Sequence, residues 1–279
     1  MAKGFAVQRR ANQKTILLSR AKQGWGLLFC LGLVLLNTGC STTGSSWYDY
    51  PGSRKSPAPV TAAWDPRTFI PAAAALVIAV TDSDQKISDW ASRHHPVYGS
   101  QDSAESASNS LRGLLAASAV VTTFMAPGKQ DAYLPGRPGN MVVGVMSAAT
   151  TSMLTNDLKD STGRARPNGV DQRSLPSSHS SAASTYASIA SHGVNQLPIS
   201  AGQRSFWNVG FVTLAAATAW ARVEANAHYP TDVLAGFALG NFTTMLLHAS
   251  MEDPEHPPQV GVILDQKYDA FMIIMSLPF

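Results

Sequence analysis

Beyond residue 60, this 279-residue sequence lacks any uninterrupted apolar run of the roughly 20 residues that a membrane-spanning helix needs. What it contains instead is a set of alanine-rich apolar stretches broken by Thr, Ser or Asn. They cover roughly residues 68–81, 112–126, 141–155, 179–192, 206–221 and 233–249, and each is bounded by Gly, Pro or short polar residues. An amphipathic stretch near residues 83–99 adds a further helix. The pattern argues against several membrane spans and predicts an all-α domain with a six-helix core and no internal repeats.

Acidic residues are absent from the first 40 positions, which carry six basic residues. These are followed by a segment from Gly24 to Gly39 that is apolar apart from Asn37 and Thr38, and the sequence LLNTGC then ends in Cys40. A basic region, an apolar region and an exit of small residues are typical of a secretory signal.

The exit LLNTGC resembles a bacterial lipoprotein signal, in which residues 1–39 are removed and Cys40 is lipidated. Asn37 departs from the pattern, because an aliphatic residue usually stands three positions before the cysteine. The resemblance implies a lipid-anchored protein on the periplasmic face of the bacterial cell envelope. Ser41, in place of Asp, implies the outer membrane. An uncleaved membrane anchor is the alternative.

Cysteine is scarce, and Cys30, the other of the two cysteines, lies inside the predicted signal. No disulfide can therefore form within the mature chain, which must depend on a hydrophobic core. Loss of the six leader cations leaves 15 basic against 18 acidic residues, a net charge of −3. The basic character of the whole chain thus belongs to the leader and gives no reason to expect a nucleic-acid partner.

Composition divides the rest of the chain into three parts. Residues 40–63 are rich in Ser, Thr, Gly and Pro, which predicts a flexible tether. Residues 64–257 contain the helical stretches. Residues 258–279 include VGVILDQKYDAFMIIMSLPF, whose β-branched and aromatic residues predict a strand or short hairpin packed on the helical body.

Two polar clusters stand at predicted helix ends. LKDSTGRARPNG places Lys159 on a helix and Arg166 seven residues later, held extended by the proline that follows. SLPSSHSSAAS places His179 at the start of an Ala/Ser helix, directly after Ser177 and Ser178. A helix N-terminus offers free N–H groups and a positive dipole end to a phosphate. Each cluster taken singly also fits a solvated surface or an ordinary helix start.

A third cluster, ARVEANAHYPTD, contains Arg222, His228 and Asp232. Arg222 could simply complement the C-terminal dipole of an apolar helix, which would leave His228 in an ordinary turn. The other interpretation is a nucleophile with an orienting acid and an anion-binding cation beside it.

The three clusters occur in the order K-x6-RP, PSSH and R-x5-H-x3-D over residues 159–232. In this order they resemble the signature motifs of the type-2 phosphatidate phosphatase superfamily, which includes lipid phosphatases, class A acid phosphatases and vanadium haloperoxidases. The resemblance implies a core bundle of the acid phosphatase and vanadium haloperoxidase type. Ser178 stands where this family usually has Gly, and Ala221 where it usually has Ser.

The resemblance also implies roles. His228 would attack phosphorus and form a phosphohistidine, Asp232 would orient its ring, and His179 would protonate the leaving oxygen. The implied phosphate-binding residues are Lys159, Arg166, Ser177, Ser178 and Arg222. These cations and a helix N-terminus supply the positive charge that metal-dependent phosphatases take from metals, so neither a metal nor another cofactor is expected.

The sequence therefore predicts a metal-independent phosphatase for phosphate monoesters or pyrophosphates, with phosphorylated lipids among the candidate substrates. The alternatives are a vanadate-dependent haloperoxidase and a non-catalytic envelope lipoprotein that uses the fold for binding. Other polar residues receive structural interpretations. His94 and His95 end a helix, while Arg164 and Glu224 are expected to shape the pocket mouth or to pair with each other.

Overall fold

The computed structural model describes residues 58–132, 134–251, 259–265 and 270–276. Its helices are α2 (Ala58–Trp64), α3 (Pro66–Val80), α4 (Asp84–His94), α5 (Gln101–Met125), α6 (Gly136–Thr162), α7 (Ser178–Asn195), α8 (Ala201–Glu224) and α9 (Pro230–Met251). The predicted all-helical class is confirmed for this domain. Each helix from α3 to α9 overlaps a stretch expected from the sequence, and several extend into flanking polar residues.

The N-terminal end of the predicted helical domain differs in detail from expectation, whereas the C-terminal segment contains the expected hairpin. Helix α2 begins at Ala58, so the last residues of the range 40–63 are helix rather than tether. Near the C-terminus, β1 (Gln259–Asp265) and β2 (Ala270–Ser276) pair antiparallel, with Gln259 opposite Ser276. The predicted signal peptide, Cys40 and the rest of the tether lie outside the described residues.

Polar side chains set the helix boundaries that matter for the site. Ser100, Ser177 and Ser200 are the N-caps of α5, α7 and α8, and the side-chain oxygen of each accepts a hydrogen bond from a backbone N–H in the first turn. Helix α6 ends at Gly163, whose φ of 52° is the left-handed conformation that glycine adopts without strain.

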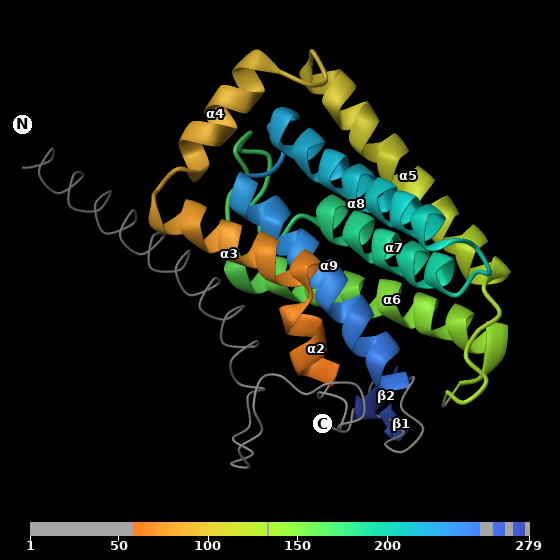
Figure 1. Cartoon of the computed structure of the whole chain (residues 1–279). Coiled ribbons are helices and arrows are strands. Elements are labelled where there is room, and N and C mark those ends of the chain that lie inside the picture. The colour runs from red at the N-terminus through yellow and green to blue at the C-terminus, as the bar shows by residue number, and fades with distance from the viewer. Residues whose placement is uncertain (1–57, 133, 252–258, 266–269, 277–279) are drawn as a thin grey trace, which may run out of the picture.

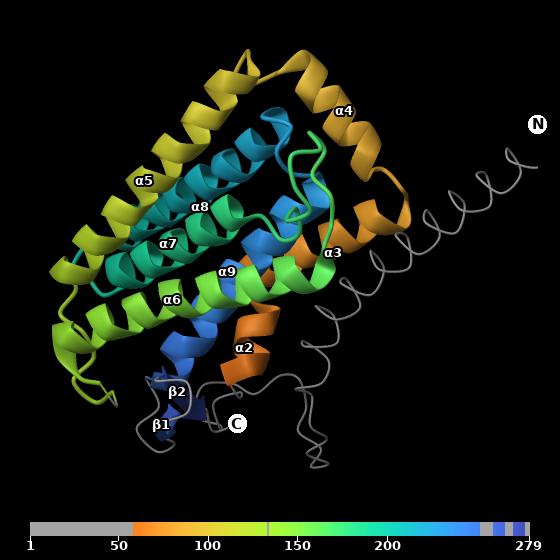
Figure 2. The same ribbon diagram turned by 180° about the vertical axis from the view of Figure 1, so that it is seen from behind.

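Helix α7 is the centre of the bundle and packs against α5, α6, α8 and α9 (Figures 1 and 2). Its serines form a ladder to α9: Ser180 Oγ donates to Val233 O (2.5 Å), Ser184 Oγ to Phe237 O (2.7 Å) and Ser188 Oγ to Asn241 Oδ1 (2.5 Å). Because the donors recur every four residues, they lie on one face of α7.

Two glycines let α9 approach α7 this closely. A Cβ at Gly236 would lie 2.6 Å from Ser177 O, and one at Gly240 would lie 2.2 Å from Ser181 O, so neither position has room for a larger residue. The contact fixes the N-terminus of α7 relative to that of α9, and both termini carry candidate site residues.

The outward faces of several helices are apolar. The core cluster includes Leu115, Ile189, Phe211 and Phe237. Large apolar side chains nevertheless point outward from four helices: Phe69, Ile70, Val77 and Val80 on α3; Val120 and Phe124 on α5; Val145 and Met153 on α6; Phe206 and Val209 on α8. The sequence interpretation of these helices as buried core is therefore only half right, because helix length and residue type do not reveal which face is covered.

Membrane-spanning capacity within the described residues is limited to few helices. Helix α9 is long and apolar enough to cross a membrane, although 61% of its most apolar 18-residue window is buried inside the bundle. Helices α2 and α3 pass the same test only as a pair, bent by 60°.

Candidate active site

The three predicted clusters meet at one end of the bundle, near α4 (Figures 1 and 2). Lys159 lies in the last turn of α6, His179 in the first turn of α7, Arg222 in the last turn of α8, and Asp232 in the first turn of α9. The backbone N–H of Ser177 donates to the carbonyl oxygen of Asp232 (2.9 Å), which ties two of these clusters together.

His228 is buried, with 2% of its surface exposed. Its Nδ1 donates to the backbone carbonyl of Ser174 (2.8 Å), and Asp232 Oδ2 lies farther away, at 3.7 Å. The Nε2 atom therefore keeps its lone pair, toward which Arg166 Nη1 points from 3.3 Å. Burial lowers the pKa of His228 to about 4, although Asp232 acts against this shift, so the ring is neutral near pH 7.

Asp232 is fully buried and makes several hydrogen bonds. Its Oδ2 accepts from Ser174 Oγ (2.5 Å) and from the backbone N–H of Tyr229 (2.9 Å). Its Oδ1 accepts from Arg164 Nη1 (2.6 Å). Burial alone would raise the pKa of Asp232, but the charge of Arg164 and the hydrogen bonds outweigh it, so the pKa is lowered and the group is a carboxylate.

Arg164 is the main residue whose role the sequence interpretation missed. It bridges Asp232 to Asp84 at the start of α4 (2.5 Å) and also donates to Thr231 Oγ1 (2.7 Å). Its guanidinium carbon lies 4.2 Å from the centre of the Tyr229 ring. The motif pattern contained one signal for this role, an arginine two residues before the fixed position of Arg166.

The expected pairing of Arg164 with Glu224 is wrong. Glu224 is fully buried at the end of α8, where it accepts from the backbone N–H groups of Val97 and Tyr98 (both 3.0 Å) and from Trp220 Nε1 (2.5 Å). It therefore anchors the loop between α4 and α5. The pairing failed because Arg164 is drawn to two other acids and the three donors already satisfy Glu224.

His179 lies at the entrance of the site, in contact with α5. Its Nε2 donates to Asn109 Oδ1 (2.9 Å). Burial, together with the positive charges of Arg222 and Arg112, lowers the pKa of His179 to about 3. In the unliganded site this imidazole is therefore neutral.

Lys159, Arg166 and Arg222, here termed the cation cluster, converge on the space beside the two histidines. Burial, together with the charge of Arg166, lowers the pKa of Lys159 to about 8. Burial also lowers the pKa of Arg222, and the charge of Arg166 adds to that shift. The positive charges of the three side chains are thus close enough to repel one another electrostatically.

Each member of the cation cluster is held by a neighbour. Lys159 Nζ donates to Arg173 O (2.6 Å), Arg166 Nε to Asp171 Oδ1 (2.8 Å), and Arg222 Nη1 to Ser108 Oγ (3.1 Å). Glu105 Oε1 also lies 3.7 Å from Arg222 Nη1.

The two serines before His179 differ. Ser177 is fully buried, its N–H donates to Asp232 O, and its Oγ caps α7 by accepting from Ser180 N (3.4 Å). Ser178 is half-buried and is the first residue of α7. Both predicted phosphate-binding serines therefore lie at the site. The N–H and Oγ of Ser177, however, already form hydrogen bonds within the protein.

One wall of the site comes from α5, where sequence analysis assigned no residue. Glu105, Ser108, Asn109 and Arg112 lie on one face of this helix, and the first three contact Arg222 or His179. Their spacing of three, four and seven residues in ESASNSLR was a signal for such a polar face.

Buried neutral histidines beside clustered cations on an antiparallel helical bundle define an anion-binding site of the kind that phosphoryl-transfer proteins use. Residues 141–255 match the family model of the PAP2 superfamily. This match confirms the resemblance that the three motifs predicted.

Two individual proteins extend this relationship. Over 104 residues the chain is 34% identical to the lipid A 1-phosphatase of Porphyromonas gingivalis; the match covers 37% of this chain and 22% of that protein. The chain thus spans about a fifth of the relative's length. A transmembrane PAP2 type phosphatidylglycerolphosphate phosphatase from Bacillus subtilis has a similar fold, with a TM-score of 0.50 at 22% identity, covering 66% of this chain and 92% of that one.

Proposed function

We propose that the protein is a metal-independent phosphatase that acts through a phosphohistidine at His228. The observation that carries this proposal is the orientation of the His228 ring. Its Nδ1 proton is held by Ser174 O and its Nε2 lone pair faces Arg166, a member of the cation cluster. A neutral imidazole with one nitrogen free is the form that can attack phosphorus.

In the proposed reaction, Nε2 of His228 bonds to phosphorus while the bond from phosphorus to the leaving oxygen breaks. His179, at the site entrance, is positioned to give that oxygen a proton. A water molecule then attacks the phosphohistidine and releases inorganic phosphate, and its proton passes to His179. Negative charge on the substrate offsets the cations that lower the pKa of His179, so binding itself favours the protonated acid.

The cation cluster would hold the phosphate oxygens. Lys159, Arg166 and Arg222 bring charge from three different elements, and the N-terminus of α7 adds backbone N–H groups near Ser178. Asp232, whose carboxylate lies beside His228, is not available for a divalent cation, since Arg164 pairs with it and with Asp84. This arrangement supports a mechanism without a metal.

The proposed substrates are phosphorylated lipids, with phosphate monoesters and pyrophosphates both included. The names of the two similar proteins support this substrate class. The apolar outward faces of α3, α5, α6 and α8 support contact of the domain with membrane lipids. We also propose that α3 and α5–α9 form the six-helix core of the family, and that a lipid on Cys40 tethers the domain at the periplasmic face of the outer membrane.

The test is phosphate release by purified full-length protein from phosphatidate in mixed micelles and from p-nitrophenyl phosphate. We expect turnover in excess EDTA, inhibition by vanadate, and acid-labile, base-stable labelling of wild type by a ³²P substrate. His228→Asn should lose label and turnover, while His94→Asn, on exposed α4, should retain both.

Three results would contradict parts of the proposal. Activity lost in EDTA and restored by Mg²⁺ would refute the metal-free mechanism. Peroxide-dependent bromide oxidation by the vanadate-loaded protein without phosphatase activity would favour the haloperoxidase alternative. Tight phosphate binding without either activity would favour the non-catalytic alternative.

A further inference from the structure

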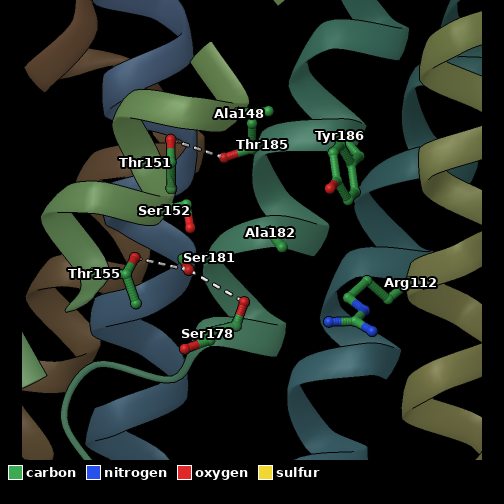
Figure 3. Close-up of a pocket in the computed structure, with 10 residues that line it drawn as sticks. All are labelled: Arg112, Ala148, Thr151, Ser152, Thr155, Ser178, Ser181, Ala182, Thr185 and Tyr186. Carbon is green, nitrogen blue, oxygen red and sulfur yellow. Dashed lines mark hydrogen bonds between the residues drawn. The ribbon is translucent and has the colours of Figure 1, made fainter. Parts of the chain in front are cut away.

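A hydroxyl-lined cavity of about 190 Å³ opens between α5, α6 and α7 beside the start of α7. Ser178, next to His179 in the chain, lines its end, so the cavity adjoins the candidate active site. Thr151 and Thr155 of α6 and Ser181 and Thr185 of α7 form one wall (Figure 3). The cavity is polar where it meets the site and was not anticipated from the motifs.

The hydroxyl groups of this wall are bonded mainly to one another. Thr155 Oγ1 donates to Ser181 Oγ (3.0 Å), which in turn donates to Ser178 O (3.2 Å). Thr185 Oγ1 donates to Thr151 Oγ1 (3.1 Å). These hydrogen bonds hold the hydroxyl groups of the wall in place, and the wall residues named here carry no charge. A positive charge for an anion in the cavity must therefore come from another side.

Arg112 supplies a positive charge on the opposite side. Its side chain extends from α5 toward the turn of α7 that carries Ser178 and Ala182 (Figure 3). Among the residues that the structure describes, its guanidinium forms no hydrogen bond and no ion pair. Arg164, Arg166 and Arg222 each have an acidic neighbour instead.

The charge of Arg112 acts on the active site. After burial and the charge of Arg222, it is the next cause that lowers the pKa of His179, and it also contributes to the lowered pKa of Arg222. An uncompensated cation beside other cations is unfavourable until an anion arrives. The charge of Arg112 acts on His179, and His179 faces the leaving group in the proposed mechanism. An anionic group bound by Arg112 would therefore lie on the leaving-group side of the substrate.

We propose that Arg112 is a specificity-determining residue that binds a second phosphate attached to the scissile one, so that the preferred substrates are diphosphate esters. This inference rests on the proposed phosphatase function. When His228 attacks the terminal phosphorus, the bond from phosphorus to the bridging oxygen breaks, and its electron pair stays on the departing phosphate monoester. Arg112 would stabilise the charge that grows on that group. A phosphate leaving group also needs less protonation than an alkoxide, which suits a neutral His179.

The kinetic test compares farnesyl diphosphate with farnesyl phosphate, which share one alcohol. Arg112→Gln should lower kcat/KM for the diphosphate by about 10–100-fold, the loss typical of one charge-assisted contact, and change the monophosphate by less than about threefold. Arg112→Lys should recover much of the preference. The control is Arg204→Gln, a half-buried arginine in the first turn of α8 at the far end of the bundle, which should leave the ratio unchanged.

A binding test does not depend on turnover. In the full-length His228→Ala variant, inorganic pyrophosphate should bind more tightly than inorganic phosphate by calorimetry, and adding Arg112→Gln should abolish the difference. Equal losses on both farnesyl substrates, or pyrophosphate preference that survives Arg112→Gln, would overturn the role of Arg112. If wild type released no phosphate but bound pyrophosphate more tightly than phosphate in a way that required Arg112, the phosphatase function alone would be refuted.

Discussion

Replacement of Arg164 by Met should destabilise the fold more than the loss of any exposed ion pair. The substitution keeps much of the side-chain volume but removes the only cation paired with Asp232 among the described residues. The Asp232 side chain is fully buried and that of Asp84 is 14% exposed, so water can replace the guanidinium only in part. Removing one partner from a buried ion pair typically costs about 3–5 kcal/mol.

The hydrogen bonds that Asp232 and Asp84 keep in the Arg164→Met variant place the expected loss of stability within this range. Asp232 would keep Ser174 Oγ and the N–H of Tyr229, and Asp84 would keep both groups of Thr231. We therefore expect a loss at the lower end, about 3 kcal/mol. Equilibrium urea unfolding at pH 7.5 measures this, provided that the unfolding transition is two-state for both proteins.

The matched control is Arg173→Met, which breaks the ion pair of Arg173 with Asp160 on the surface. The two side chains are 45% and 60% exposed, so the expected loss is below about 1 kcal/mol. Acidification gives a second readout. The lowered pKa of Asp232 contributes stability above its unfolded value of 3.8 that is lost as pH falls through the folded value. Without Arg164 this loss should begin at a higher pH. Equal losses for the two Met variants would refute the reasoning.

Four further predictions concern single side chains. Because His228 is buried and neutral, its side chain binds a proton in the unfolded chain but not in the folded one between pH 6.5 and about 4. This residue alone should therefore cost wild type about 3 kcal/mol of stability as pH falls through this window, and His228→Asn should lose correspondingly less in urea unfolding across that range. His179→Ala should slow turnover of alkyl phosphates by about 10²–10⁴-fold but spare aryl phosphates, and equal losses would argue against an acid role. Gly240→Ala should destabilise by at least about 1–3 kcal/mol, since its Cβ would lie 2.2 Å from a carbonyl oxygen, whereas Gly210→Ala, with open space, should stabilise slightly by thermal unfolding. Cys40→Ala should abolish palmitate labelling, and unchanged labelling would exclude the lipoprotein prediction.

The placement of most candidate site residues could be predicted from the sequence because they lie at a helix end or in the loop beside one. Gly163 ends α6 after Lys159, Ser177 caps α7 before His179, and Pro230 begins α9 just after His228. Local signals of this kind depend on neighbours in the chain, so they can be read without a fold. They predict one end of each of these three helices and the order in which the helices place the side chains.

The contribution of α5 could not be predicted in the same way. Ser108, Asn109 and Arg112 stand among alanines and serines, where small polar residues ordinarily mark a solvated helix face. They become part of the site only because α5 packs against α7 and α8, far along the chain. Asp84 is a similar case, since it reaches Arg164 across 80 positions. The spacing of residues along the chain does not predict such long-range contacts, because they depend on how the helices pack.

The distribution of charge explains why a buried ion-pair network persists beside the cation cluster. Asp232, if unpaired, would draw the nearby cations and neutralise the space that a phosphate needs. Arg164 instead satisfies both Asp232 and Asp84 away from that space. The positive charge of the cation cluster therefore remains available to an anion. Burial, together with this positive field, lowers the pKa of His228 and His179 and keeps both rings neutral. The network thus separates the orienting acid from the cations, which is the condition for an unprotonated nucleophile and a strong phosphate site to coexist.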